Sequence, residues 1–188
     1  NKYLLQATGP YLKVYNNAVD VSAVQGTSSS GIYGMYLTTN TGTEVKNNIV
    51  NITGGNNGTK YGIYVSSASV PANLQKNNVY LNSTQSGTQT PYYYGAAYAS
   101  LAAFQTAQPT MEVGSPSVDP MFTSATTGDL TPASSSIINS GTNVFLDVPA
   151  DINGLPRSPL PTIGAFEFLP TGNNDAKAVV FLSPSSAF

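Results

Sequence analysis

The sequence predicts an all-β fold: a right-handed parallel β-helix (solenoid) with an irregular C-terminal closure and one short helix. Two recurring phrases carry this prediction. A pair of asparagines recurs as Asn16-Asn17, Asn47-Asn48 and Asn77-Asn78, at separations of 31 and 30 residues. A Tyr-Gly phrase recurs as Tyr33-Gly34-Met35-Tyr36-Leu37 and Tyr61-Gly62-Ile63-Tyr64-Val65. A fixed period in this range indicates stacked repeats that bury their apolar faces against each other.

The length of the repeat favours strands over helices. About 30 residues hold three strands of ordinary length with their turns. Before residue 99, no segment shows apolar residues at the helical spacings of three and four. We therefore expect parallel coils over about residues 1–98, with Asn16, Asn47 and Asn77 stacked about 4.8 Å apart. The third copy departs in one respect, because Gln75 stands where Val14 and Val45 precede the earlier pairs.

Alternation along each phrase predicts which side chains face the core. A period of two places Tyr33 with Met35 and Leu37, and it places Gly34 and Tyr36 on the opposite face. The second phrase follows the same pattern. Four apolar residues should therefore point inward: Met35, Leu37, Ile63 and Val65. Tyr36 and Tyr64 should point outward. The residues that follow the asparagine bends should also point inward, namely Ala18, Ile49 and Val79.

The second half of the chain predicts a closure and then a boundary. Residues 99–107 form the one segment with helical character, because Ser100 can cap it and Leu101 and Phe104 fall on one side. Residues 108–168 are rich in Pro and Ser and should close the solenoid irregularly. We expect residues 1–168 to be the C-terminal part of a β-helix domain. Residues 169–188 should be a linker and the start of a following β domain, because residues 170–174 break the composition before an apolar run.

Composition excludes several classes of partner and cofactor. Charged residues make up 9% of the chain, the net charge is -2, and Arg157 is the one arginine. This argues against nucleic acid, which requires clustered basic residues. The chain has no Cys and no His, which removes disulfides, thiolate metal sites and the commonest general base. We expect no cofactor, no metal and no membrane insertion, because no run of 18 apolar residues occurs.

Four phrases near the C-terminus occur in a characteristic order. They are Val118-Asp119-Pro120-Met121-Phe122, Ser136-Ile137-Ile138-Asn139-Ser140-Gly141, Asp151-Ile152-Asn153-Gly154-Leu155-Pro156-Arg157 and Ile163-Gly164-Ala165-Phe166-Glu167. This order resembles the C-terminal part of right-handed parallel β-helix proteins that bacteria export, especially surface proteins of the Bacteroidetes type. The resemblance covers about residues 12–168 and departs at Ser140 and Thr162. It implies a secreted or cell-surface location, but the family contains adhesins as well as polysaccharide-active enzymes.

The acidic residues do not predict a catalytic or metal site. Asp20, Glu44 and Glu112 are isolated, and the other acids before residue 169 lie in the closing region. General acid–base catalysis requires two such groups in one cleft. The phrase that begins at Asp151 is similar to the start of a calcium loop but lacks the remaining ligands. We expect these acids to organise turns, and we expect Arg157 to pair with Asp151 or Glu167.

The tyrosines are the better candidates for contact with a partner. Tyr36 and Tyr64 should lie one coil apart on the outer face, and Tyr92, Tyr93 and Tyr94 are close in sequence. Aromatic side chains can bind sugars or protein surfaces. The alternative is that they stack only on each other and stabilise the sheet.

These observations favour a non-catalytic β-solenoid module of a secreted bacterial cell-surface protein. It would act as a stalk or adhesin, with carbohydrate binding as one activity, and its partners would be an extracellular glycan or a protein surface and further domains of the same polypeptide. The alternative is a polysaccharide lyase or glycoside hydrolase whose catalytic coils lie upstream of this chain.

Overall fold

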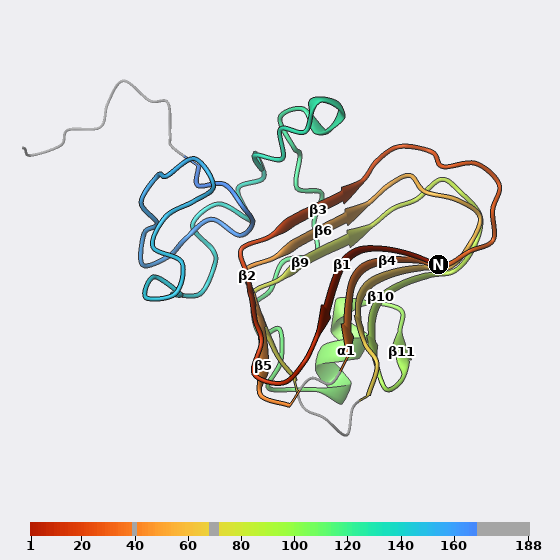
Figure 1. Ribbon diagram of the computed structural model, residues 1–188, viewed down its shortest axis with the longest axis horizontal. Helices are drawn as coiled ribbons and strands as arrows, with labels where there is room; N and C mark the ends of the chain where they lie inside the picture. The colour runs from red at the N-terminus through yellow and green to blue at the C-terminus, as the bar shows by residue number, and fades with distance from the viewer. Residues whose placement is uncertain (39–40, 68–71, 169–188) are drawn as a thin grey trace, which may run out of the picture.

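The computed structural model describes residues 1–38, 41–67 and 72–168, which form a parallel β-helix of about three turns (Figure 1). Three sheets run along the solenoid. Sheet A contains β1 (Lys2–Thr8), β4 (Ile32–Thr38), β7 (Lys60–Val65), β10 (Gln89–Tyr94) and β11 (Ala97–Tyr98). Sheet B contains β2 (Lys13–Tyr15), β5 (Thr43–Lys46) and β8 (Ala72–Gln75). Sheet C contains β3 (Ala18–Val21), β6 (Ile49–Ile52) and β9 (Asn78–Leu81).

The predicted parallel pairing is confirmed between every pair of coils. Each strand pairs in parallel with the equivalent strand of the next coil, and β11 alone among the described strands pairs antiparallel, with β10. The core fills the space between the three sheets. Met35, Leu37, Ile63 and Val65 are all at most 1% exposed, as the alternation predicted.

The short helix is also confirmed. Helix α1 (Leu101–Ala107) begins after Ser100, whose hydroxyl group accepts a hydrogen bond from the backbone N–H of Ala103. Its one buried residue, Phe104, stacks on Tyr92 with ring centroids 4.6 Å apart. The helix therefore adds its apolar side to the core beside β10. A single 3-10 turn, η1 (Ala125–Thr127), lies in the closing region.

The predicted equivalence of Asn16, Asn47 and Asn77 is wrong by one residue in the third coil. Strand pairing places Lys76, not Asn77, opposite Asn47, because Gln75 pairs with Lys46. All three equivalent residues have positive φ angles, at 52° for Asn16, 57° for Asn47 and 55° for Lys76. The third coil therefore uses a lysine at a bend where asparagine is the more favourable residue. With this register, Leu74 is the residue equivalent to Val45. The third coil therefore has an apolar residue at this position, and Gln75 is not a departure from the repeat.

The second residue of each bend forms a ladder of Asn17, Asn48 and Asn77, which is buried at Asn48 and Asn77. The side-chain oxygen of Asn48 accepts from the backbone N and from Nδ2 of Asn17, both at 2.9 Å. Asn77 accepts in the same way from Asn48, at 3.0 and 2.8 Å. At the end of the ladder the carboxylate of Glu112 takes the place of a fourth asparagine. It accepts from the backbone N of Asn77 at 3.0 Å and from its Nδ2 at 2.7 Å.

The first residue of each bend points outward and holds residues 109–168, which we name the closing segment. Each donates to a backbone carbonyl group: Asn16 to Gly164, Asn47 to Thr142 and Lys76 to Gly114. Consequently the two residues of each bend have different roles, one outside and one inside. Figure 1 shows the later part of the closing segment, in blue, beside the corner where β2 meets β3.

Two of the three residues predicted to point inward after the bends do not. Val79 lies in the main core, but Ile49 packs outside it, against Ile137 and Ile163 of the closing segment. Ala18 packs against this same small cluster. The neighbouring Val50, which pairs with Val79, takes the inward position instead, because Asn48 points inward and side chains alternate along the strand.

The predicted contact of Arg157 with a carboxylate is confirmed. Its Nη1 lies 2.5 Å from Oε1 of Glu167, and both side chains are at least 94% buried. The guanidinium group also donates to the carbonyl oxygens of Thr162, Gly164 and Ala165. Arg157 therefore fixes the end of the closing segment. The predicted boundary at residues 169–188 lies outside the described residues.

Candidate functional site

Six tyrosines lie side by side on the outer face of sheet A. We name them the tyrosine face: Tyr3, Tyr33, Tyr36, Tyr61, Tyr64 and Tyr93. They come from four successive strands, β1, β4, β7 and β10. The strand register aligns them in two columns, one with Tyr3, Tyr33 and Tyr61 and the other with Tyr36, Tyr64 and Tyr93. Both predicted ligand-binding residues, Tyr36 and Tyr64, belong to this face.

The rings stack within a column and meet edge to face between columns. Tyr36 and Tyr64 are stacked with centroids 5.1 Å apart, and Tyr64 and Tyr93 are stacked at 4.2 Å. Tyr33 and Tyr61 stack at 4.7 Å in the other column. Tyr33 meets Tyr36 at an interplanar angle of 86°. The rings thus cover much of one another, as the alternative of mutual stacking predicted.

The prediction that Tyr33 shares a face with Met35 is wrong, because the glycine between them interrupts the alternation. Gly34 faces the core, where a Cβ atom would lie 2.3 Å from Cγ1 of Val50. Gly62 is equivalent, with Cγ1 of Val79 at 2.3 Å from the position of a Cβ atom. Gly34 and Gly62 therefore point inward, not outward as predicted. Consequently the two tyrosines of each Tyr-Gly-x-Tyr phrase emerge on the same outer face.

The tyrosine face is uncharged. The charged residues of these four strands, Lys2 and Lys60, are in register with buried Ile32 and not with a tyrosine. Burial, followed by the neighbouring Tyr93, raises the pKa of Tyr64 to about 12. Burial likewise raises the pKa of Tyr33. These phenols remain protonated at physiological pH and can both donate and accept hydrogen bonds.

Of the three tyrosines at residues 92–94, only Tyr93 joins the face. Tyr92 and Tyr94 are 1% and 4% exposed and point into the core. Sequence reasoning placed Tyr36 and Tyr64 on the outer face but did not place Tyr3 there, because Tyr3 has no Tyr-Gly phrase around it. The signal for Tyr33 and Tyr61 was present in the recurring phrase, although alternation assigned them to the wrong side.

The carboxylates outside the C-terminal end stabilise local structure. Asp20 accepts hydrogen bonds from the hydroxyl group of Ser22 and the amide of Asn51, both at 2.6 Å. Asp119 and Asp129 each accept from a backbone N–H two residues later. These are the turn-organising roles that the sequence predicted.

The structure brings Asp151 and Glu167 close together. Asp151 accepts hydrogen bonds from the backbone N–H groups of Asn153, Leu155 and Glu167. Burial is the largest single effect and raises the pKa of Asp151, but these hydrogen bonds and Arg157 together hold the pKa below its ordinary value. Burial raises the pKa of Glu167. The hydrogen bond from the N–H of Thr162 and the nearby charge of Arg157 oppose this rise. Backbone and guanidinium donors thus occupy both carboxylates. Within the described residues, no group of three or more acidic side chains could hold a metal ion.

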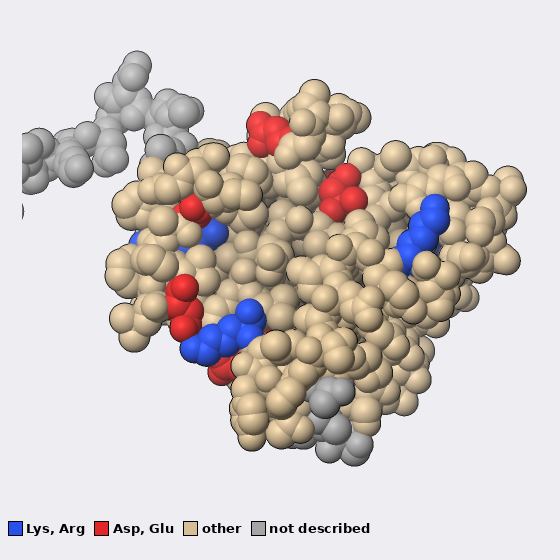
Figure 2. Space-filling model, viewed as in Figure 1, with Lys and Arg blue, Asp and Glu red and all other residues tan. Residues whose placement is uncertain are grey.

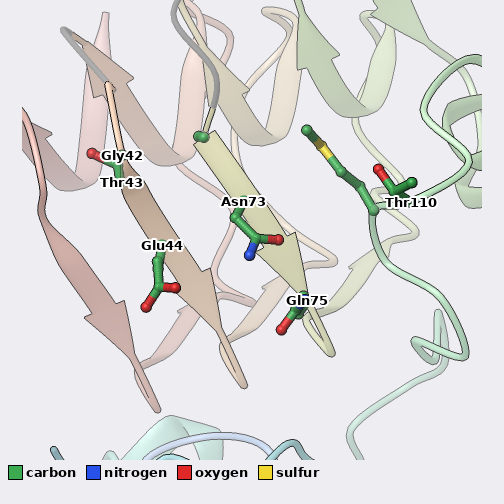
Figure 3. A pocket seen from close by; sticks show the side chains of 8 residues that line it. Gly42, Thr43, Glu44, Asn73, Gln75 and Thr110 are labelled. Atoms are coloured by element: carbon green, nitrogen blue, oxygen red, sulfur yellow. The ribbon is translucent and has the colours of Figure 1, made fainter.

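A groove lies on the outer face of sheet B (Figure 3). Its cavity of about 460 Å³ is lined by Gly42, Thr43, Glu44, Ala72, Asn73, Gln75, Thr110 and Met111. Figure 3 shows Glu44 projecting from β5, Asn73 and Gln75 projecting from β8, and Thr110 across from them on the closing segment. A second hollow of about 350 Å³ shares Glu44 and extends to residues 143–147. The sequence did not predict this groove, because Thr110 and Met111 of the closing segment form one of its walls.

Charges beside this groove are paired with each other. Glu44 accepts from the hydroxyl group of Tyr15 and lies 3.0 Å from Nζ of Lys46. The hydrogen bond from Tyr15, then that from Lys46, lowers the pKa of Glu44. Lys13 lies 2.7 Å from Asp147. In Figure 2 charged side chains are sparse, and acidic and basic groups lie next to each other at the lower left.

Searches of protein families, of curated proteins and of solved structures found no match to this chain. Of the residues that the structure describes, none forms a helix with the length and hydropathy needed to span a bilayer.

Proposed function

We propose that this chain is a non-catalytic β-solenoid module of a secreted bacterial cell-surface protein, where it acts as a stalk or adhesin. Its tyrosine face would bind an uncharged polysaccharide. The observation that carries the proposal is the alignment of six tyrosines from four strands on one uncharged outer face. The cell-surface part rests on the resemblance of the closing segment to exported β-helix proteins.

An extended chain with many hydroxyl groups matches this face. Stacked coils make a continuous surface, which suits an extended partner. The tyrosines hold each other in place through their stacking, so that little side-chain freedom is lost on binding. The phenol groups are neutral and form hydrogen bonds with hydroxyl groups, and the exposed hydroxyl groups of Thr8 and Thr38 flank them, 2.8 Å from each other. A charged polymer could form no ion pair with the tyrosines of this face.

The roles of the carboxylates support a non-catalytic module. Asp20, Asp119 and Asp129 hold turns or neighbouring side chains. Asp151 and Glu167 have their oxygens occupied by donors that fix the closing segment. A catalytic acid–base pair needs carboxylates that can reach a substrate.

The test is a binding and cleavage assay of the protein with a panel of neutral and anionic polysaccharides. We expect binding to neutral polymers without new reducing ends or unsaturated products. Tyr36→Ala and Tyr64→Ala should each weaken binding about tenfold, because truncating an aromatic contact commonly costs more than 1 kcal/mol. Tyr80→Ala is the matched control, since Tyr80 is a half-buried tyrosine of β9 in sheet C.

Three results would overturn the proposal. The first is cleavage that is lost when a carboxylate pair is substituted, which would establish the lyase or hydrolase alternative. The second is the absence of binding to every polysaccharide of the panel. The third is equal binding by the wild type and by both tyrosine variants, with circular dichroism showing that the fold is intact.

A further inference from the structure

The groove on sheet B has a regular polar floor. On the outer face of sheet B, Lys13, Glu44 and Asn73 are in register in one row, and Tyr15, Lys46 and Gln75 in the next. Of these residues, Glu44, Asn73 and Gln75 line the cavity. The closing segment borders the cavity with Thr110 and Met111, whereas residues 143–147 border the adjoining hollow that shares Glu44. A cavity of about 460 Å³ lies within the range of small-molecule sites.

The floor contains polar side chains without a hydrogen-bond partner among the residues that the structure describes. The side-chain amides of Asn73 and Gln75 are half-buried, and the described structure gives neither of them a hydrogen-bond partner. Such amides carry two donor hydrogens and one acceptor oxygen each. By contrast, the inward asparagines at the bends, Asn17, Asn48 and Asn77, all form hydrogen bonds within the ladder. Asn73 and Gln75 are thus available to a ligand.

Glu44 provides a fixed acceptor next to these amides. The hydroxyl group of Tyr15 and the ammonium group of Lys46 hold its carboxylate in place and favour its ionised form. An ionised carboxylate can accept about four hydrogen bonds, so that positions remain open to donors from a ligand. Because Lys46 balances Glu44 and Lys13 balances Asp147, the groove has no net charge.

We propose that this groove is a second binding site, which takes a single neutral sugar unit. A pyranose carries adjacent hydroxyl groups that both donate and accept, which matches the two amides, the carboxylate and the hydroxyl group of Thr110. Its apolar face can pack against Met111, which lines the same cavity. The site is on a different sheet from the tyrosine face and does not depend on the function proposed for that face.

The test is a nuclear magnetic resonance titration of the isotope-labelled protein with neutral monosaccharides. The probes are the methyl glycosides of glucose, galactose and mannose, and N-acetylglucosamine. At least one probe should shift the side-chain amide signals of Asn73 and Gln75 in a saturable manner. Asn73→Ala should weaken this binding about tenfold, which corresponds to the loss of one or two good hydrogen bonds.

Two controls separate this site from other effects. Asn57→Ala removes a half-buried asparagine outside the groove and should leave the affinity unchanged. Tyr36→Ala should also leave it unchanged, so that a failure of the tyrosine face does not affect the result. The proposal is overturned if no probe shifts these amide signals saturably, or if Asn73→Ala binds as tightly as the wild type. The wild-type amide signals decide the question even where a variant folds poorly.

Discussion

Tyr92 and Tyr94 are buried tyrosines of one strand whose hydroxyl groups have different environments. The hydroxyl group of Tyr92 is buried without a hydrogen-bond partner in the described structure, while its ring stacks on Phe104. The hydroxyl group of Tyr94 accepts a hydrogen bond from the backbone N–H of Ala72 at 3.2 Å. A buried polar group without a partner costs the folded state the full loss of its hydration.

We therefore expect opposite effects from the same substitution at these two residues. Tyr92→Phe should raise the free energy of unfolding by about 1 kcal/mol, because it removes an unsatisfied hydroxyl group and keeps the stacked ring. Tyr94→Phe should lower it by about 1–2 kcal/mol, because it leaves the N–H of Ala72 without an acceptor. Urea denaturation of the two variants measures both changes. A loss of stability in Tyr92→Phe would show that this hydroxyl group has a partner after all.

At the scale of elements, the asparagine ladder and its terminal carboxylate join the coils to the closing segment. Glu112 is completely buried and accepts hydrogen bonds from Asn77 and from the hydroxyl group of Ser115. Burial raises the pKa of Glu112 to about 7, against the opposing effects of Ser115, Asn77 and Lys76. The ladder thus ends on a carboxyl group that titrates near neutral pH.

This raised pKa predicts how stability depends on pH. Since the folded pKa lies above the unfolded value of 4.5, the contribution of Glu112 to stability is fully present below pH 4.5 and is lost as the pH rises through about 7. The total loss corresponds to about 3 kcal/mol. Glu112→Gln should flatten the decrease in unfolding free energy between pH 4.5 and 7, measured by urea denaturation across this range.

The difference in pH slope between the wild type and Glu112→Gln reports on Glu112. Glu167 also has a raised pKa, but it titrates with the same sign in both proteins. Asp119→Asn is the control, since Asp119 is an exposed carboxylate of the closing segment. An equal pH slope in Glu112→Gln and the wild type would contradict the prediction.

At the scale of the whole molecule, the solenoid and the closing segment have separate hydrophobic clusters. The main cluster lies between the three sheets, and the smaller one joins Ile49 to Ile137 and Ile163. The C-terminal end of the closing segment depends on Arg157, which donates to Glu167 and to three backbone carbonyl groups. Lysine cannot reproduce this fork of donors.

We expect Arg157→Lys to loosen residues 151–167 while the coils keep their protection. Hydrogen exchange monitored by mass spectrometry should show faster exchange in that range and unchanged exchange in β4 to β9. The reason is that the small cluster and the main core are stabilised by different contacts. Lys13→Ala, which removes an exposed ion pair with Asp147, should change exchange little. A uniform loss of protection over the coils would show that the two parts unfold together.

The repeats in the sequence determined the solenoid. Paired asparagines and the Tyr-Gly phrase at a period near 30 residues predicted parallel coils of three strands, the inward Met35 and Ile63, and the outward Tyr36 and Tyr64. A local pattern suffices for these features, because every coil repeats the same bend and the same alternation. The contact of Arg157 with a carboxylate was also predicted, because the planar fork of donors on the one arginine suits a carboxylate.

Tertiary structure decided the register and the surfaces. Lys76 replaces asparagine at the third bend, and a positive φ angle at lysine has no sequence signal. The inward orientation of Gly34 and Gly62 follows from the closeness of Val50 and Val79, which come from another sheet. The groove, the small cluster at Ile49 and the carboxylate of Glu112 at the end of the ladder all depend on where the closing segment packs. Such contacts join residues far apart in the chain, so that spacing within the sequence cannot specify them.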